Sequence, residues 1–183
     1  MAAYLSRGFN VAALFGINAV LLVALFDQFV FGELPCPLCL LQRMGFIMVG
    51  CGFLLNVRYG ASSLHYGVVI LSALAGALAA GRQVLLHIVP GTGTFGAALF
   101  GWHFYTWAFI AFMLTLLGVG LILLVEARVG EARAATVGGR PGQWAGFLFA
   151  GVVLVNAVST FLQCGLGPCA DDPTGYLLLE RQP

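Results

Sequence analysis

Four of the five cysteines in this 183-residue chain form two closely spaced pairs. Cys36 and Cys39 make up the first pair, and Cys164 and Cys169 make up the second. Paired thiols can serve as a structural disulfide, a redox centre or metal ligands, and the number of cysteines does not distinguish these uses. The position of each pair along the chain has to decide between them.

The first pair lies in the segment Pro-Cys-Pro-Leu-Cys, directly before an apolar stretch. A pair at the N-terminus of a helix lies at the positive end of the helix dipole, which favours the reactive thiolate. Arg43 follows Cys39 by four residues, so the two share a helical face and the guanidinium adds positive charge beside the sulfur. It could also stabilise an anionic quinone. We predict a redox pair, because a disulfide that encloses so few residues contributes little to the stability of a fold.

The second pair encloses the segment Gly-Leu-Gly-Pro, whose glycines allow the chain to fold back on itself. We predict that Cys164 and Cys169 also undergo thiol–disulfide exchange. The alternative is a static clip on the C-terminal tail. A zinc site built from all four paired cysteines is conceivable, but no further cluster of soft ligands supports it.

The composition indicates that these pairs belong to a membrane protein. The chain is 61% hydrophobic and 8% charged, whereas soluble domains carry roughly a quarter charged residues. A net charge of +1 gives no indication of nucleic-acid binding. Five stretches are long and apolar enough to span a bilayer as helices: about 9–31, 40–57, 64–89, 102–125 and 144–162. The predicted fold is an all-α membrane protein, a four-helix transmembrane bundle plus a fifth transmembrane helix, forming one domain over residues 1–183.

Arginine positions predict how the helices cross the membrane. One side receives Arg7, Arg58, Arg128, Arg133 and Arg140, and the other receives Arg43, Arg82 and Arg181. The positive-inside rule then places the N-terminus in the cytoplasm and the C-terminus outside. Both cysteine pairs fall on the outer face, where disulfides persist, with the second pair in a tail over 163–183. We expect the polar segment 126–143 to be a mobile inner connector and the apolar loop 90–101 to lie along the membrane surface.

The segment from Cys36 to Arg43, Cys-Pro-Leu-Cys-Leu-Leu-Gln-Arg, resembles the signature of the disulfide bond formation protein B (DsbB) family. The segment from Gly81 to His87, followed by Pro-Gly, is similar to that family's third helix and second outer loop, and the likeness covers roughly residues 20–125. It implies an enzyme of the bacterial inner membrane that reoxidises a periplasmic thioredoxin-fold thiol oxidase. The electrons would pass to the membrane pool of ubiquinone or menaquinone.

The resemblance also implies roles for individual residues. Cys39 would face the quinone with help from Arg43, and Cys36 would exchange with the second pair. His87 is a candidate quinone neighbour. Arg82 and Gln83 either line the quinone pocket or form hydrogen bonds between helices.

One departure from the family concerns the second pair. The best-known members carry it between helices three and four, but here the loop 90–101 has no cysteine and the pair follows an additional helix. The implied electron path remains possible: partner dithiol, Cys164–Cys169, Cys36–Cys39, quinone. The identity of the partner is what this departure leaves open.

Three other functions are compatible with parts of the sequence. A vitamin K epoxide reductase-like enzyme also combines cysteine pairs with quinone chemistry, and a haem protein could use His87 and His103. A membrane assembly factor or adaptor with structural disulfides would show no turnover. Asp27, near the outer end of the first helix, forms either a structural ion pair or part of a proton route, and Cys51 is expected to be a small core residue.

Overall fold

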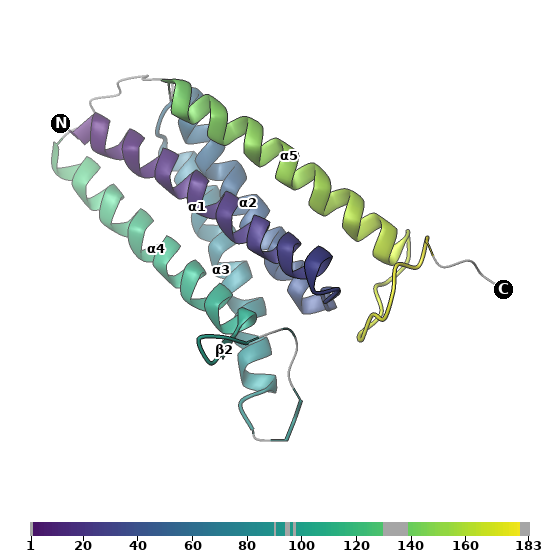
Figure 1. Ribbon diagram of the computed structural model, residues 1–183. Helices are drawn as coiled ribbons and strands as arrows, with labels where there is room; N and C mark the ends of the chain where they lie inside the picture. The colour runs from purple at the N-terminus through teal and green to yellow at the C-terminus, as the bar shows by residue number, and fades with distance from the viewer. Residues whose placement is uncertain (1, 90, 94–95, 97, 130–138, 180–183) are drawn as a thin grey trace.

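The chain folds into long helices that run side by side, as the computed structural model shows (Figure 1). It describes residues 2–89, 91–93, 96, 98–129 and 139–179. The elements in this part of the chain are α1 (Ala2–Val30), α2 (Pro37–Tyr59), α3 (Ser63–Leu86), β1 (Ala98–Leu99), β2 (Trp102–His103), α4 (Phe104–Val129) and α5 (Gly139–Cys164). All 5 helices are long and apolar enough to cross a membrane. The prediction of an all-α membrane protein with a fifth spanning helix is therefore confirmed.

Several helices end at different residues than predicted. α4 continues to Val129 and α5 begins at Gly139, so much of the predicted connector 126–143 is helical. Residues 130–138, which include Arg133, and the C-terminal Arg181 lie outside the described residues. α3 stops at Leu86 because His87 leaves the helical conformation as its C-cap, with φ −113° and ψ 12°. Backbone hydrogen bonding does not stop where the apolar composition stops, which explains why α4 and α5 extend beyond their apolar stretches.

All five helices contribute to the hydrophobic core, and α2, α3 and α4 pack closely within it. Phe112 of α4 stacks on Phe46 of α2, with ring centroids 4.0 Å apart and an interplanar angle of 12°. A side chain at Gly45 or Gly76 would overlap or crowd the Phe112 ring, so these glycines let the three helices approach closely. Gly52 similarly brings α2 against Val69 of α3.

A buried polar network joins α1, α2 and α3 at the end of the bundle where α1 begins. The Asn10 amide donates to the Tyr66 hydroxyl over 2.7 Å, and the Asn56 amide donates to the Asn10 side-chain oxygen over 2.9 Å. Ser6 is also within hydrogen-bond distance of the Tyr66 hydroxyl. Bonds of this kind between membrane helices contribute on average about 0.6 kcal/mol each. They link the helices at one end of the bundle, and the cysteine pairs lie at the opposite end.

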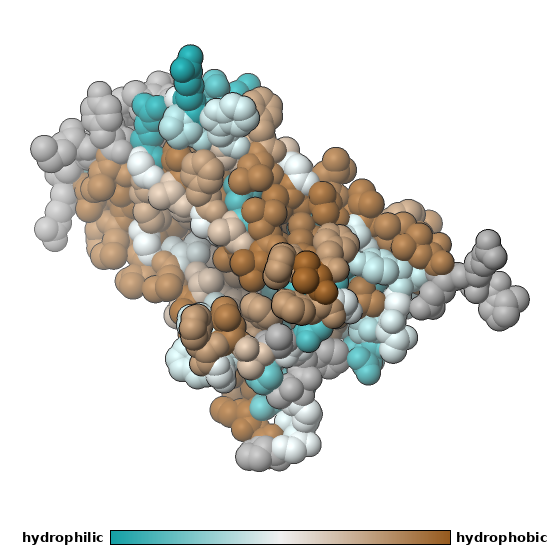
Figure 2. Space-filling model, in the orientation of Figure 1, coloured by the Kyte–Doolittle hydropathy of each residue, from teal (hydrophilic) through white to brown (hydrophobic). Residues whose placement is uncertain are grey.

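The fifth helix packs along α1 (Figure 1). The Asn18 amide of α1 donates to the Ala145 carbonyl of α5 over 3.1 Å, and the Phe149 ring covers Gly50 of α2. The start of α1 and the end of α5 consequently lie at opposite ends of the bundle. Figure 2 shows that hydrophobic residues make up most of the helix surface on the face in view, as a surface in contact with lipid requires.

Candidate active site

The first cysteine pair forms a disulfide at the N-terminus of α2. Cys36 is the N-cap, and its sulfur accepts a hydrogen bond from the backbone N–H of Cys39 over 3.1 Å. Pro37 is the first helical residue, where the missing N–H of proline costs nothing. The Pro-Cys-Pro-Leu-Cys segment thus builds a helix start with both sulfurs in its first turn. Cys36 is buried, with 4% of its surface exposed, whereas Cys39 is partly exposed.

Gln83 of α3 lies against both sulfurs of this disulfide. Its side-chain Nε2 is 3.4 Å from the Cys36 Sγ and 3.6 Å from the Cys39 Sγ. Its Oε1 accepts a hydrogen bond of 2.6 Å from the Gln42 amide, which orients the Gln83 N–H groups toward the sulfurs. Gln83 is 1% exposed and is not part of the cavity wall formed by the neighbouring residues. Gln83 therefore links α3 to α2 and contacts the disulfide without lining the cavity.

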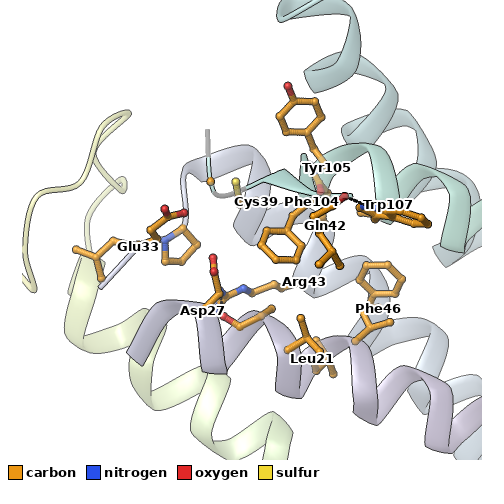
Figure 3. A pocket seen from close by; sticks show the side chains of 18 of the residues that line it. Leu21, Asp27, Glu33, Cys39, Gln42, Arg43, Phe46, Phe104, Tyr105 and Trp107 are labelled. Atoms are coloured by element: carbon orange, nitrogen blue, oxygen red, sulfur yellow. Dashed lines mark hydrogen bonds between the residues drawn. The ribbon is translucent and has the colours of Figure 1, made fainter. Parts of the chain in front are cut away.

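A cavity of about 760 Å³ opens beside Cys39 (Figure 3). It lies between α1, α2 and α4, and the segment before α4 and the C-terminal tail complete its wall. Cys39 contributes to this wall, but its disulfide partner Cys36 does not. The other polar or aromatic side chains around it include Asp27, Gln42, Arg43, Phe46, His87, Phe104, Tyr105 and Trp107. Of the two sulfurs, Cys39 is therefore the one that faces the cavity.

Arg43 lines the same cavity and links three helices. Its guanidinium donates to the Gln28 Oε1 over 2.6 Å and to the Ala24 carbonyl over 2.9 Å, both on α1, and to the Asn156 Oδ1 of α5 over 3.5 Å. Figure 3 shows the side chain extending toward α1, where Asp27 lies. Asp27 and Arg43 attract each other electrostatically. These bonds fix the position of a positive charge near the cavity.

The second cysteine pair forms a disulfide at the C-terminus of α5. Cys164 is the last helical residue, and Gly165 follows with a φ of +62°, a conformation that favours glycine at a helix end. The tail then turns back on the helix. The Leu177 N–H donates to the Gln163 carbonyl over 3.3 Å, and the Leu178 N–H donates to the Leu162 carbonyl over 3.1 Å. These bonds satisfy carbonyls that would otherwise lack partners at the end of α5.

Hydrogen bonds of the end of α5 and of the tail hold the second disulfide near the first pair. The Gln163 amide, next to Cys164, donates over 2.8 Å to the carbonyl of Pro35, next to Cys36. The Gln28 amide donates to the Tyr176 hydroxyl over 3.0 Å and to the Ser159 hydroxyl over 2.6 Å. Residues 172 and 173 of the tail also belong to the cavity wall beside Cys39. Both disulfides thus lie at the same end of the bundle.

The remaining predicted residues occupy different positions. His87 lines the cavity and packs against Tyr105, with ring centroids 5.6 Å apart. His103 stacks on the same Tyr105 ring. Arg82 is exposed and is not part of the cavity wall. Cys51 is a free thiol that packs against the hydrophobic core.

For the zinc alternative, the paired cysteines are engaged in disulfides, and the described residues contain no group of three or more His, Cys, Asp or Glu side chains that could hold a metal.

The sequence did not point to Gln28, Gln163 and Tyr176, which hold the end of α5 and the tail near the first pair. Gln28 and Gln163 are buried, with 2% and 5% of their surfaces exposed. A polar side chain inside an apolar stretch is a signal that could have identified Gln28. The tail position of Tyr176 carries no comparable signal.

Comparison with known proteins finds similarity to one family over the first three helices. The family described as disulfide bond formation protein DsbB matches residues 6–95. Disulfide bond formation protein B of Nitrosomonas eutropha is 43% identical over 71 residues, which cover 37% of this chain and 44% of that protein. Disulfide bond formation protein B 1 of Pseudomonas savastanoi pv. phaseolicola is 40% identical over 93 residues, covering 48% of this chain and 54% of that protein. The chain therefore spans about half the length of the curated relatives it matches. No solved structure is significantly similar to the chain.

Proposed function

Because residues 6–95 belong to the family of disulfide bond formation protein DsbB, we propose that this multi-pass membrane protein is a thiol:quinone oxidoreductase. It would take electrons from protein thiols outside the bacterial inner membrane and pass them to a quinone, which supports disulfide bond formation. The observation that carries the proposal is that Cys39, which is disulfide-bonded to Cys36, faces a cavity of about 760 Å³. The second disulfide at the same end of the bundle supplies a route for electrons to reach it.

The cavity suits a quinone in size and chemistry. Its volume lies within the roughly 300–1,000 Å³ that is usual for small-molecule sites. Phe46, Phe104 and Trp107 offer apolar walls for a ring and its hydrocarbon tail. The three described hydrogen bonds of Arg43 use three of the five N–H groups of a guanidinium, so donors remain for a quinone oxygen. His87 is one of the other polar groups in the wall. When bound, a quinone would accept two electrons and two protons from the reduced cysteine pair.

The ends of two helices favour electron flow from the second pair to the first. Cys36 and Cys39 lie at the N-terminus of α2, whose partial positive charge stabilises a thiolate. Cys164 lies at the C-terminus of α5, where the partial negative charge destabilises one. Stabilising the thiolate of a reduced pair makes its disulfide the stronger oxidant. The first disulfide should therefore oxidise the second pair after that pair has accepted electrons.

The contact between Gln163 and Pro35 supports direct exchange between the pairs. These two residues immediately precede Cys164 and Cys36, and a single hydrogen bond of 2.8 Å joins them. Exchange requires one thiolate to reach the sulfur of another disulfide. The bond holds the end of α5, and with it Cys164, next to the segment that contains Cys36.

The proposal is tested by quinone reduction in detergent solution. The purified chain is given a reduced thioredoxin-fold dithiol oxidase and a soluble analogue of ubiquinone or menaquinone, and quinone absorbance is followed. We expect turnover in the unmodified chain and in Cys51→Ala, and loss in Cys39→Ser and in Cys164→Ser. The two quinone analogues, compared in parallel, identify the preferred acceptor.

Two outcomes would contradict parts of the proposal. Loss in Cys39→Ser alone would mean that donors reach the first pair directly and that Cys164–Cys169 is structural. No turnover of the unmodified chain with any donor or quinone would favour an assembly factor or adaptor with structural disulfides.

A further inference from the structure

The two disulfides share a pattern of burial that suggests a direction for the relay. In each pair one cysteine is buried and the other is partly exposed: Cys36 and Cys164 are 4% and 5% exposed, while Cys39 and Cys169 are more accessible. The buried members are the two whose preceding residues are joined by a hydrogen bond. The accessible Cys39 faces the cavity. The accessible Cys169 lies beyond the end of α5, in the tail.

From this pattern we infer that Cys169 is the sulfur that receives electrons from an external protein thiol, and that Cys164 passes them inward to Cys36. The inference rests on the proposed function, whose relay it orders. A thiolate attacks a disulfide along the S–S axis, so the attacked sulfur must be accessible to the attacking protein. Cys164, enclosed at the end of α5 by the returning tail, does not meet that requirement.

The first two exchanges follow from this assignment. A donor thiolate attacks the Cys169 sulfur; the donor–Cys169 bond forms, the Cys164–Cys169 bond breaks, and Cys164 leaves as a thiolate. The Cys164 thiolate attacks the Cys36 sulfur; the Cys164–Cys36 bond forms, and Cys39 leaves as a thiolate beside the cavity. The negative end of the α5 dipole raises the free energy of the Cys164 thiolate, which favours this second attack.

Two further exchanges complete the transfer. The second thiolate of the donor attacks the donor sulfur that is bonded to Cys169, which releases an oxidised donor and a Cys169 thiolate. Cys169 then attacks Cys164, which restores the tail disulfide and releases Cys36. The donor has lost two electrons and two protons, and the pair Cys36 and Cys39 has gained them. A quinone is the oxidant that would restore this pair.

The loop between the tail cysteines also indicates the class of donor. Leu166 lies inside this loop and is 97% exposed, although the chain turns back over its neighbours. An exposed leucine in the same short loop as the accessible cysteine fits a donor protein with an apolar surface around its thiol, rather than a small polar thiol such as glutathione.

The test measures thiol exchange without quinone, so that it is independent of the proposed quinone reduction. Full-length variants retain one thiol each, on a background of Cys36→Ser, Cys39→Ser and Cys51→Ala. The added change is Cys164→Ser in one variant and Cys169→Ser in the other. Each is mixed with glutathione disulfide or with oxidised thioredoxin, and formation of the mixed disulfide is timed. We expect the Cys169 thiol to react at least about tenfold faster than the Cys164 thiol with both probes.

The contribution of Leu166 is measured in the variant that retains Cys169. Leu166→Ser should slow the reaction with thioredoxin about tenfold, which corresponds to about 1.4 kcal/mol, and leave the reaction with glutathione disulfide unchanged. Leu179→Ser is the matched control, because Leu179 is an exposed leucine of the same tail outside the disulfide loop. Equal slowing by both changes, or slowing with both probes, would overturn the role of Leu166.

A second measurement keeps the intact tail disulfide in case the single-thiol variants fold poorly. The Cys36→Ser, Cys39→Ser chain is mixed with reduced glutathione and quenched with acid, and mass spectrometry locates the adduct. An adduct on Cys169 supports the inference, and an adduct on Cys164 overturns it. If the adduct forms on Cys169 but the unmodified chain reduces no quinone, the proposed function is contradicted and the order inferred here is not. If quinone turnover occurs while Cys164 reacts first, only the order inferred here fails.

Discussion

The contact of Gln83 with both sulfurs of the first disulfide predicts a measurable effect on the reduction potential of that pair. The Gln83 Nε2 lies 3.4 Å and 3.6 Å from the two sulfurs. It stabilises a thiolate of the reduced pair more than the neutral disulfide. Hydrogen bonds to charged groups contribute about 1.5–3 kcal/mol, and sulfur is a weak acceptor, so the low end applies. For a two-electron couple about 1.4 kcal/mol corresponds to 30 mV. We therefore expect Gln83→Leu to make the potential about 30 mV more negative.

The assay equilibrates the full chain in detergent with glutathione buffers of graded potential. Cys164→Ser and Cys169→Ser are introduced so that only the first pair exchanges, and the reduced fraction is read from the mass added by a thiol alkylating reagent. Leu85→Ala is the matched control, because Leu85 lies on the same turn of α3 and is exposed. It should leave the potential unchanged. A Gln83→Leu chain that unfolds normally but has an unchanged or more positive potential would refute the reasoning.

Other predictions concern the cavity and the core. Arg43→Lys is expected to slow quinone reduction on the order of tenfold in the absorbance assay, because one charge-assisted bond contributes about 1.5 kcal/mol and an ammonium cannot match the guanidinium fork; an unchanged rate would contradict this. Cys51→Ala should keep quinone turnover within about twofold, since the thiol packs in the core as a small hydrophobe. Gly76→Ala should lower the free energy of unfolding by about 1–3 kcal/mol in thermal melts, because an added Cβ would overlap the Phe112 ring. Gly120→Ala, where nothing lies nearby, is the control.

Much of the fold could be predicted from the sequence because lipid imposes a simple rule. A stretch of about 20 apolar residues must satisfy its backbone hydrogen bonds internally, so five such stretches predict five helices. The ends were less predictable. α5 begins at Gly139, within a segment whose polar composition predicted a connector. Composition describes contact with lipid, whereas a helix ends where capping and neighbouring backbone allow it to end.

The candidate site could be predicted only where local chemistry marks it. The Cys36–Cys39 spacing and the Arg43 that follows lie within one short segment, so the sequence contains all the information needed to associate them. The contact between Gln163 and Pro35 joins residues more than a hundred positions apart, and nothing in either segment points to the other. Arg82 illustrates the opposite case, because its neighbour Gln83 faces the sulfurs while Arg82 faces outward. One helical position decides which of two polar neighbours points inward.

The fifth helix explains how the loop before α4 can lack cysteines without disrupting the proposed relay. Thr92, Gly93 and Leu99 of this loop belong to the cavity wall, and the Trp107 indole donates to the Leu99 carbonyl over 3.0 Å. The loop therefore helps to enclose the cavity. A loop that closes a cavity gains from a fixed position, whereas a cysteine pair that exchanges with two partners must move between them. Placing the pair at the end of α5 and on the tail that follows separates these requirements. The loop can remain in place during exchange, while Gln163 holds the end of α5 at the first pair and Tyr176 holds the tail against α1.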